Sequence, residues 1–301
     1  MCPARPKDCD SEHTMTSLLV EPAARSVETR ACLVDSHVGL VEDLQREGAL
    51  HKTPEAHCDV FQVCLPYRGL FVWHVGAEEV VGDANQVVYV RRNEAYRMSA
   101  PLESGYAELI ITPRIDMLAE VAHINGARFS DHPLFRLRTK HADPAMKATG
   151  LRFLHWARSA SSKDQLERDE AVLTLLKHAF CTPSTNVRVT PASARLIRRA
   201  KEFLHRNLRE RILLQDIARD VDASATYLTD LFSRVEGCAL HEYLTRLRLS
   251  EALAELPHSS DLTALALELG FSSHSHFTYA FRRRFGCTPS QFRRLTKQER
   301  T

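Results

Sequence analysis

The chain has 301 residues, of which 44% are hydrophobic and 26% are charged, and its formal net charge is +2. This composition is that of a folded chain of about two domains, and it excludes a largely disordered protein. No stretch of about 18 uninterrupted apolar residues occurs, so we expect no membrane span. Residues 1–29 are acidic in part and lack a long apolar core, so we expect a flexible tail rather than a secretory signal, with Met15 as a candidate natural start.

The cysteines are scattered along the chain and form no C-x-x-C pair, which is typical of a protein from a reducing compartment. We therefore expect a cytoplasmic protein. Two alternatives remain for the thiols: they are idle or buried, or Cys58 and Cys64 act as a redox switch. The eight cysteines are Cys2, Cys9, Cys32, Cys58, Cys64, Cys181, Cys238 and Cys287.

The region from Cys58 to about Pro113 is rich in Val, Phe, Tyr and Trp and is interrupted by Gly, Pro, Asp and Asn. This pattern predicts five to eight short antiparallel strands, folded as a sandwich or small barrel. After Pro113 the apolar spacing changes to three and four residues, which predicts helices. The helical segments are RIDMLAEVAHI, PAMKATGLRFLHWARSA and KDQLERDEAVLTLLKHAF. Together these segments predict a mixed domain over residues 30–180.

Residues 181–192 carry Pro, Ser, Thr and Asn without an apolar period, so they are the predicted linker. The apolar spacing predicts helices over most of residues 193–297. The predicted fold class is therefore α+β, with an all-α C-terminal domain. The charge is uneven. Residues 191–301 hold 18 Lys and Arg against 13 Asp and Glu, a net charge of +5, and the preceding residues carry −3. A basic C-terminal part favours a polyanion partner.

The C-terminal region contains one pattern used twice. YLTDLFSRVEGCALHEY, residues 227–243, aligns with HFTYAFRRRFGCTPSQF, residues 276–292, at a constant offset of 49. Phe232 matches Phe281, and Gly237 matches Gly286. Each copy consists of a short helix, a turn, a second helix that begins at Ser, and then Gly-Cys. This is the pattern of two tandem helix-turn-helix units.

A helical wheel separates the two faces of each second helix. The predicted core faces hold Leu228, Leu231, Phe232 and Val235 in the first unit, and Phe277, Ala280, Phe281 and Phe285 in the second. A major groove admits one such helix, whose N-terminal residues meet base edges while arginines further along meet phosphates. We expect the cluster Arg282-Arg283-Arg284 to supply affinity. The outward residues are Thr226, Asp230, Ser233 and Arg234, and then Ser275, Tyr279, Arg282 and Arg283.

The segment between the two units is a predicted helix of 17 residues from Leu240 to Leu256. At 1.5 Å per residue it spans about 25 Å. With the width of the flanking helices, the two recognition helices are expected roughly 34 Å apart, one turn of DNA. One chain would then read two successive major grooves.

These residues resemble the AraC/XylS family of bacterial transcription regulators over about residues 194–295. The most specific marks are the Gly-Phe turn and the Gly-x-Thr-Pro-Ser ending. The matching positions are Ile217, Ala218, Ser224, Tyr227, Leu228, Leu231, Phe232, Gly237, Tyr243, Arg248, Ala252, Ala266, Gly270, Phe271, Ser275, His276, Phe277, Ala280, Phe281, Gly286, Thr288, Pro289, Ser290, Phe292 and Arg293.

The resemblance implies a two-lobed DNA-binding domain joined to a sensing or dimerising domain. It places Asp230 and Tyr279 where the family often has Arg or Lys. An Asp that faces the groove is repelled by phosphates unless it accepts a hydrogen bond from cytosine, so we expect the second unit to dominate affinity. The base-facing positions implied by the resemblance are Thr226, Thr229, Asp230, His274, Ser275, Thr278 and Tyr279.

The N-terminal domain is similar to the cupin-like sensing halves of such regulators. If a small molecule binds, we expect an aromatic pocket; the alternative is that these aromatics simply fill the barrel. Helices between about Pro144 and Phe180 are candidates for homodimer contacts. No metal site is expected. The one His-x-His pair, His274 and His276, lies on a predicted helix, so its two side chains point in different directions. The candidate pocket residues are Phe61, Tyr67, Trp73, Tyr89 and Tyr96.

The sequence thus predicts a DNA-binding transcriptional regulator that acts on duplex DNA and is modulated by a small-molecule effector. RNA polymerase is a further expected partner, and the expected location is the nucleoid. An enzyme on the β domain is the competing class. No nucleophile elbow, phosphate-binding Gly-rich loop or paired metal motif occurs, so we expect no enzymatic activity and no cofactor. A thiol-based redox sensor remains the alternative regulator.

Overall fold

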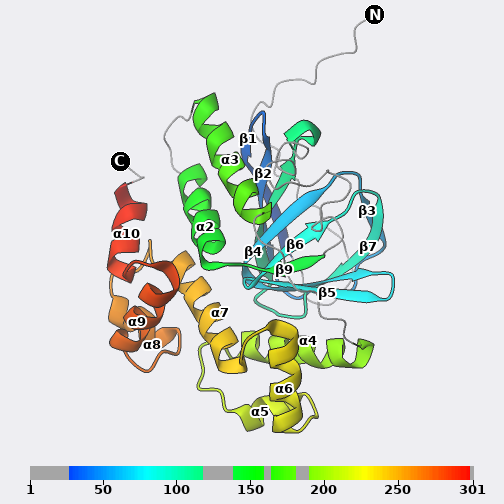
Figure 1. The fold of residues 1–301 in the computed structure, drawn as a ribbon, viewed down its shortest axis with the longest axis vertical. Coiled ribbons are helices and arrows are strands. Elements are labelled where there is room, and N and C mark those ends of the chain that lie inside the picture. Colours follow the sequence, from blue (N-terminus) through cyan, green and yellow to red (C-terminus); the bar gives the residue numbers. More distant parts are fainter. Residues whose placement is uncertain (1–26, 118–137, 159–163, 181–189, 299–301) are drawn as a thin grey trace, which may run out of the picture.

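The computed structural model describes residues 27–117, 138–158, 164–180 and 190–298 (Figure 1). Strands precede helices along the chain, which gives the predicted α+β class. The strands are β1 Val27–Asp35, β2 Gly39–Glu47, β3 Ala56–Cys58, β4 Gln62–Val75, β5 Glu78–Asp83, β6 Gln86–Val90, β7 Glu94–Ser99, β8 Tyr106–Pro113 and β9 Thr139–His141. The helices are α2 Pro144–Arg158, α3 Gln165–Phe180, α4 Pro191–Arg206, α5 Leu214–Asp220, α6 Ala225–Glu236, α7 Leu240–Glu255, α8 Leu262–Glu268, α9 His274–Phe285 and α10 Pro289–Gln298.

The strands pair antiparallel in the order β1-β2-β8-β4-β6-β9, while β5 and β7 join β4 and β3 joins β7. The long strand β4 changes partners along its length: its first half pairs with β6 and β8, and its second half pairs with β5 and β7. Its register with β8 shifts between Pro66 and Arg68, and the chain bends at the next residue, Gly69, where φ is +68°. A Cβ there would lie 2.1 Å from the Gly105 carbonyl oxygen, so only glycine fits the bend.

Two sequence-based boundaries need correction. The sequence predicts that the N-terminal tail extends through residues 27–29, but these residues begin β1, where Val27 pairs with Glu47. Most residues of β1 are exposed, so the strand lacks the apolar alternation that would reveal it. Helix α4 begins at Pro191, with the Thr190 side chain as its cap, so the last two linker residues are helical. The remaining linker positions 181–189 and most of the helix expected at RIDMLAEVAHI lie outside the described residues.

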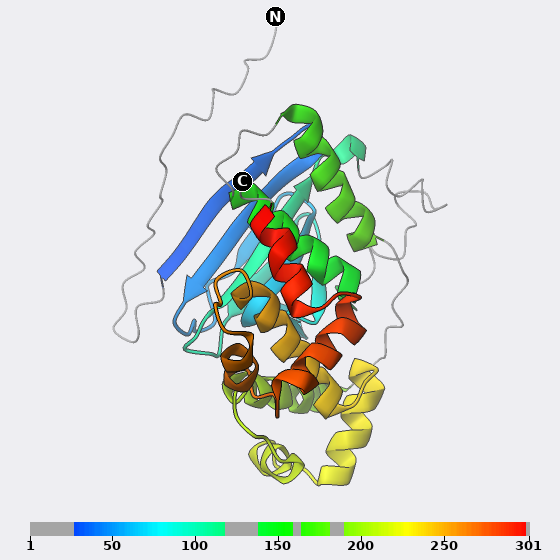
Figure 2. The ribbon, with the colours of Figure 1, turned by 90° about the vertical axis from the view of Figure 1, so that its left-hand side faces the viewer.

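Helices α2 and α3 cover one face of the sheet (Figures 1 and 2). Their apolar stripes meet inward-facing strand residues in one core, which includes Val63, Leu109 and Met146. The Tyr89 hydroxyl donates a hydrogen bond of 2.6 Å to the Ala179 carbonyl at the end of α3, so the one polar atom of this aromatic side chain is satisfied within the core.

The seven C-terminal helices form two small cores joined by α7. The first core contains Leu228, Phe232 and Leu247, and the second contains Leu249, Phe277 and Phe281. Neighbouring residues of α7 therefore belong to different cores. Each predicted unit is a packed entity of its own, and α7 is the rod between them, as expected from its length.

The N-terminal domain contacts both units. Ala84, in the turn between β5 and β6, belongs to the core of the first unit. Leu151 of α2 packs against the sheet core and also against the core of the second unit. Figure 2 shows α10 and α9 in front of α2, in agreement with the contacts between these helices.

A buried cluster of charges lies where the β5–β6 turn meets the first unit. The Lys201 ammonium is 2.8 Å from the Glu236 carboxylate and 4.0 Å from Asp83, and all three side chains are buried. The Tyr243 hydroxyl donates a hydrogen bond to Asp83. Gln86 donates to Glu236 at 3.1 Å. Buried charges are tolerated only when such partners surround them.

Burial alone would raise the pKa of Asp83, but Lys201, His205 and Tyr243 hold it well below its usual value. Asp83 is therefore an anion in the folded protein. Because its folded pKa is depressed, its contribution to stability is present above the unfolded pKa of about 3.9 and is lost as the pH falls from there through the folded pKa.

We expect Asp83→Asn to lower the free energy of unfolding by about 3 kcal/mol at pH 7, because Lys201 loses one of its two buried anionic partners. The difference from the parent protein stays the same from pH 7 to about pH 4 and is smaller at about pH 3, because Asp83 then binds a proton in the unfolded chain while it remains ionised in the folded protein. Thermal and urea unfolding at both pH values measures this. The control is Glu103→Gln, on an exposed turn residue; an equal effect there contradicts the assignment.

Candidate nucleic-acid interface

Local signals fix both ends of α6. The Ser224 hydroxyl accepts a hydrogen bond of 3.2 Å from the Tyr227 backbone N–H, which satisfies one open donor of the first turn. Gly237 ends the helix with φ of +64°, a conformation that favours glycine. The predicted start and stop of this helix are confirmed.

Helix α9 repeats the same arrangement. The Ser273 hydroxyl accepts from the His276 N–H at 3.1 Å, and Gly286 ends the helix with φ of +74°. Helix α8 before it is capped by Asp261, which accepts from Thr263 and Ala264. The second helices of the two units, α6 and α9, thus have equivalent caps and stops, as the 49-residue offset predicts, whereas α5, which corresponds to α8, begins at Leu213 without a side-chain cap.

The outward face of α6 is polar and accessible. Thr226, Asp230 and Arg234 are exposed, while Thr229 and Ser233 are half-buried. The Thr229 hydroxyl donates back to the Ala225 carbonyl, so it is already engaged within the helix. The Asp230 and Arg234 side chains lie 3.8 Å apart as an i,i+4 ion pair. An exposed pair of this kind contributes little to stability, but it reduces the positive charge that this face presents.

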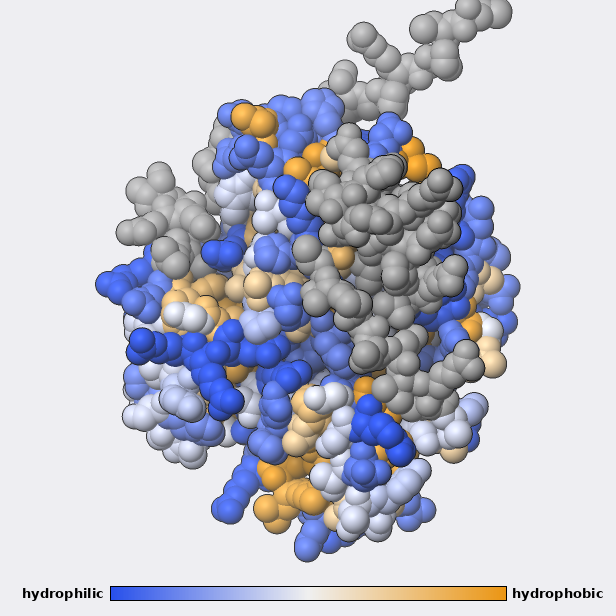
Figure 3. Space-filling view, in the orientation of Figure 1, coloured by the Kyte–Doolittle hydropathy of each residue, from blue (hydrophilic) through white to orange (hydrophobic). Residues whose placement is uncertain are grey.

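The outward face of α9 carries more positive charge. Ser275, Tyr279, Arg282 and Arg283 are exposed, and Tyr279 has 65% of its surface accessible. His274 and Thr278 are half-buried on the flank, with the His274 Nε2 3.4 Å from the Thr278 hydroxyl. Over the region where Figure 1 places α9 and α10, Figure 3 shows hydrophilic side chains beside a patch of hydrophobic ones.

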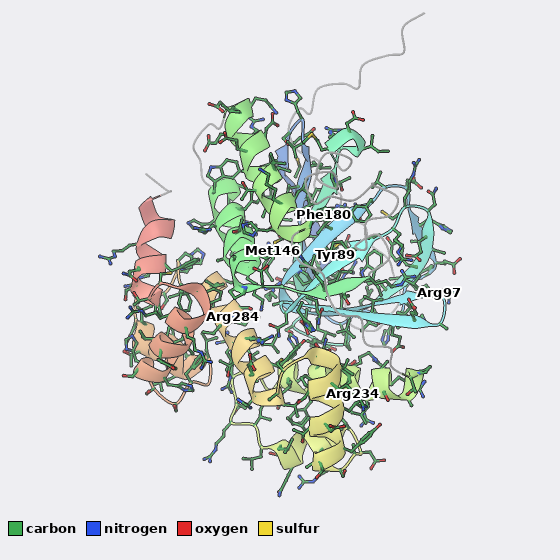
Figure 4. All side chains as sticks on the ribbon, in the orientation of Figure 1. Tyr89, Arg97, Met146, Phe180, Arg234 and Arg284 are labelled. Atoms are coloured by element: carbon green, nitrogen blue, oxygen red, sulfur yellow. The ribbon has the colours of Figure 1, made fainter. Side chains whose placement is uncertain are left out.

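The third arginine of the cluster behaves differently from its neighbours. Arg284 is half-buried and turned toward the inside of the molecule (Figure 4). Burial and the nearby charge of Arg246 lower its pKa, opposed by Glu242 and Asp143. The structure thus places Arg284 apart from Arg282 and Arg283, in agreement with the helical wheel, which puts only those two on the outward face. The contribution of the arginines to affinity stays a prediction. The helical period of 100° per residue turns Arg284 away from Arg282 and Arg283.

The five candidate pocket aromatics fall into two groups. Phe61, Tyr67 and Tyr89 pack against the core under α2 and α3, with Phe61 and Tyr89 stacked at 6.3 Å. Trp73 stacks on Tyr96 at 4.1 Å in a separate cluster. Among the described residues the five aromatics therefore do not gather around one common site, because they belong to two different core clusters.

A pocket does occur where the sheet, α2 and α7 meet. Among the five aromatics, only Tyr67 lines it. Lys147 of α2 lies at its wall, buried, and donates to Asn85 at 2.6 Å and to Ser250 of α7 at 3.0 Å. Burial lowers the pKa of Lys147 to about 7. The pocket is apolar apart from this amine, Gln86 and Ser250, and its wall includes both domains.

The two cysteines of the redox alternative belong to one apolar cluster. Cys64 is buried, and burial together with the carboxyl of Glu108 raises its pKa well above the usual value. Burial likewise raises the pKa of Glu108 to about 8. Cys58 is half-buried and donates to the Val60 carbonyl at 3.1 Å. Since the thiolate is the reactive form, Cys64 is an unreactive thiol in the folded protein.

The described part of the chain contains neither a metal-binding cluster nor a membrane-spanning helix. No group of three or more His, Cys, Asp or Glu side chains there is arranged to hold a metal ion. None of the helices described is both long enough and apolar enough to cross a membrane.

Comparison with protein-family models matches residues 217–295 to a model described as a helix-turn-helix domain. The chain is 37% identical over 100 residues to the virulence regulon transcriptional activator VirF of Yersinia enterocolitica, which is 33% of this chain and 36% of that protein. The match thus spans about a third of the relative's length. A longer match, 23% identical over 70% of this chain and 76% of the relative, is to the HTH-type transcriptional activator RhaR of Salmonella dublin.

Among solved structures, an AraC-type DNA-binding domain protein from Chromobacterium violaceum is 30% identical and covers 36% of this chain and 98% of its own, with a TM-score of 0.34. The C-terminal part of the chain is a helix-turn-helix domain. Residues 194–295 resemble the AraC/XylS type of regulator, in agreement with the names of the relatives that match this part of the chain. The relatives' names are those of transcription regulators, in agreement with the expectation of a protein that is not an enzyme.

We expect iodoacetamide to alkylate the exposed Cys32 in the native protein at pH 7.5, while Cys64 reacts only after unfolding. Peptide mass spectrometry with a time course in buffer and in urea measures both sites in one sample. Cys32→Ser is the control for peptide assignment. Equal labelling rates for Cys32 and Cys64 in buffer contradict the prediction and favour the redox alternative.

Proposed function

We propose that the protein is a sequence-specific transcriptional regulator that binds duplex DNA through α6 and α9. The observation that carries this proposal is the repetition of a capped helix that buries one face in its own core and leaves a polar face open. Such a helix fits a major groove with its N-terminal residues toward the base edges. The match of residues 217–295 to a helix-turn-helix domain supports the same function.

The proposed roles follow from the position of each side chain along its helix. Residues of the first turns read bases, and arginines of the last turns bind phosphates. In α6 the base-reading set is Thr226, Thr229 and Asp230, with Ser233 and Arg234 toward the backbone. In α9 the base-reading set is His274, Ser275, Thr278 and Tyr279, with Arg282 and Arg283 on phosphates.

The second unit supplies the larger share of the affinity in this proposal. Its outward face has two exposed arginines, Arg282 and Arg283, and no acidic residue. The first unit presents Arg234 already paired with Asp230. A positive charge that faces its own carboxylate releases fewer counterions from DNA than a free one.

The proposal extends to regulation. A small-molecule effector acts through the N-terminal domain, and the pocket beside Lys147 suits it because a ligand there touches α2 of one domain and Ser250 of the other.

The chain forms a homodimer through the outward face of α3, where Leu166 is exposed. RNA polymerase is the proposed protein partner at the promoter, and the nucleoid in the bacterial cytoplasm is the proposed location. A redox sensor is disfavoured by the raised pKa of Cys64.

The test of the proposed function is selection from random duplexes by the full-length protein at near-physiological salt, followed by footprinting on the selected site. We expect protection of two successive major-groove segments on one side of the duplex for each chain. Heparin and unselected duplexes are the competitors. Failure to enrich any sequence over unselected duplexes rejects sequence-specific binding.

The unequal contribution of the two units gives a further prediction. Replacing Arg282 and Arg283 with Ala is expected to weaken binding to the selected duplex about tenfold or more and to reduce the salt dependence by about two counterions. Arg234→Ala is expected to cost less than about threefold, since that side chain is paired. Gel-shift titration at several salt concentrations measures both.

The matched control is Arg97→Ala, on β7 and remote from both units (Figure 4). Its guanidinium is half exposed and lies 3.8 Å from Glu55. This variant removes a surface arginine without changing the proposed DNA face, so its affinity stays at the parent value. Equal losses for the Arg234 and the Arg282/Arg283 variants contradict the dominance of the second unit.

A further inference from the structure

One arginine of the rod α7 contacts both units at once. The Arg248 guanidinium donates to three backbone carbonyls: Nε to Leu208 at 2.8 Å, Nη2 to Glu210 at 2.6 Å, and Nη1 to Gly270 at 2.7 Å. Leu208 and Glu210 follow α4 in the first unit, and Gly270 follows α8 in the second. Burial lowers the pKa of Arg248, and all three of these partners are neutral carbonyl groups.

The turn at Gly270 is shaped around this side chain. Gly270 has φ of +78°, and a Cβ there would lie 2.6 Å from Nη2 of Arg248 and 2.9 Å from the Arg209 carbonyl oxygen. Both the backbone conformation and the available space therefore require glycine. The close approach brings the turn before α9 into direct contact with the guanidinium.

Arg248 also stands at the boundary between the two cores. Leu247, the preceding residue, belongs to the core of the first unit, and Leu249, the next residue, belongs to the core of the second. Apart from α7 itself, the three hydrogen bonds join the α4–α5 loop to the α8–α9 turn. A planar guanidinium offers several donors in fixed directions, whereas a lysine ammonium is a single point that cannot reach three separated carbonyls in this way.

We propose that Arg248 is a positioning residue that fixes the orientation of α6 relative to α9, so that both helices enter their grooves together. This inference rests on the proposed function. Two binding elements held at the correct separation act with a high effective concentration for the second contact, and a loose joint lowers it. The hydrogen bonds of Arg248 thus contribute to joint binding by both units and not to contacts made by either unit alone.

The experiment compares Arg248→Gln and Arg248→Lys with the parent full-length chain on three duplexes. These are the selected duplex and two half-site duplexes in which one protected segment is replaced by unrelated sequence. We expect half-site affinities to stay within about twofold, while the ratio of full-site to half-site affinity falls about tenfold or more. Insertion of base pairs between the two segments is expected to cost the variants less than it costs the parent.

Arg209→Gln is the matched control. Arg209 lies in the same α4–α5 loop, and its guanidinium pairs with Glu255 at 2.5 Å. This variant removes a charge beside the joint and leaves the three carbonyl contacts of Arg248 intact, so its full-site to half-site ratio stays at the parent value. Circular dichroism melting of every variant measures the folded fraction used to normalise affinities.

An unchanged full-site to half-site ratio in the Arg248 variants overturns the inference. An equal loss of full-site and half-site affinity also overturns it, because such a loss indicates a role in folding alone. Unfolding of both variants also overturns it, since each unit has a core of its own. If no duplex is enriched for the parent protein, the proposed function fails instead, and this result is seen before any variant is made.

Discussion

The burial of Asp83, Lys201 and Glu236 at the domain junction constrains the whole arrangement. Three charges removed from water are stable only while they remain close to one another. Asp83 comes from the β5–β6 turn, and its partners come from α4 and α6. Any rotation of the first unit away from the sheet would separate these charges or expose them one at a time. The N-terminal domain therefore contributes a buried charged side chain to the first unit of the DNA-binding domain.

This constraint acts on a domain that is itself built from two stiff parts. Each unit has a core that does not depend on the other, and α7 crosses from the first core to the second between Leu247 and Leu249. The first unit is attached to the sheet at Ala84 and the second to α2 at Leu151. The two units are thus connected to each other by α7, and each is connected to the N-terminal domain by its own contact. The positions of α6 and α9 are therefore coupled to each other and to the N-terminal domain.

Much of this architecture could be predicted from local signals. The caps Ser224 and Ser273 and the stops Gly237 and Gly286 act within one helical turn, so the sequence alone reveals them. The repeat was visible because both units bury the same apolar positions. The predicted strand region begins at Cys58 and so omits β1 and β2; the exposed residues of β1 carry no apolar alternation that would reveal it.

The domain junction could not be predicted, although it left a trace in the sequence. Lys201 lies four residues after Ile197 and three before Leu204, so it is on the buried stripe of α4. Glu236 lies four residues after Phe232, so it is on the buried stripe of α6. A charge on an apolar stripe indicates a buried partner. Its identity depends on Asp83, 118 positions before Lys201 in the chain, and no periodicity reaches across that separation. An effector that displaced the β5–β6 turn would act at this junction. Its binding free energy would then be coupled to the orientation of α6.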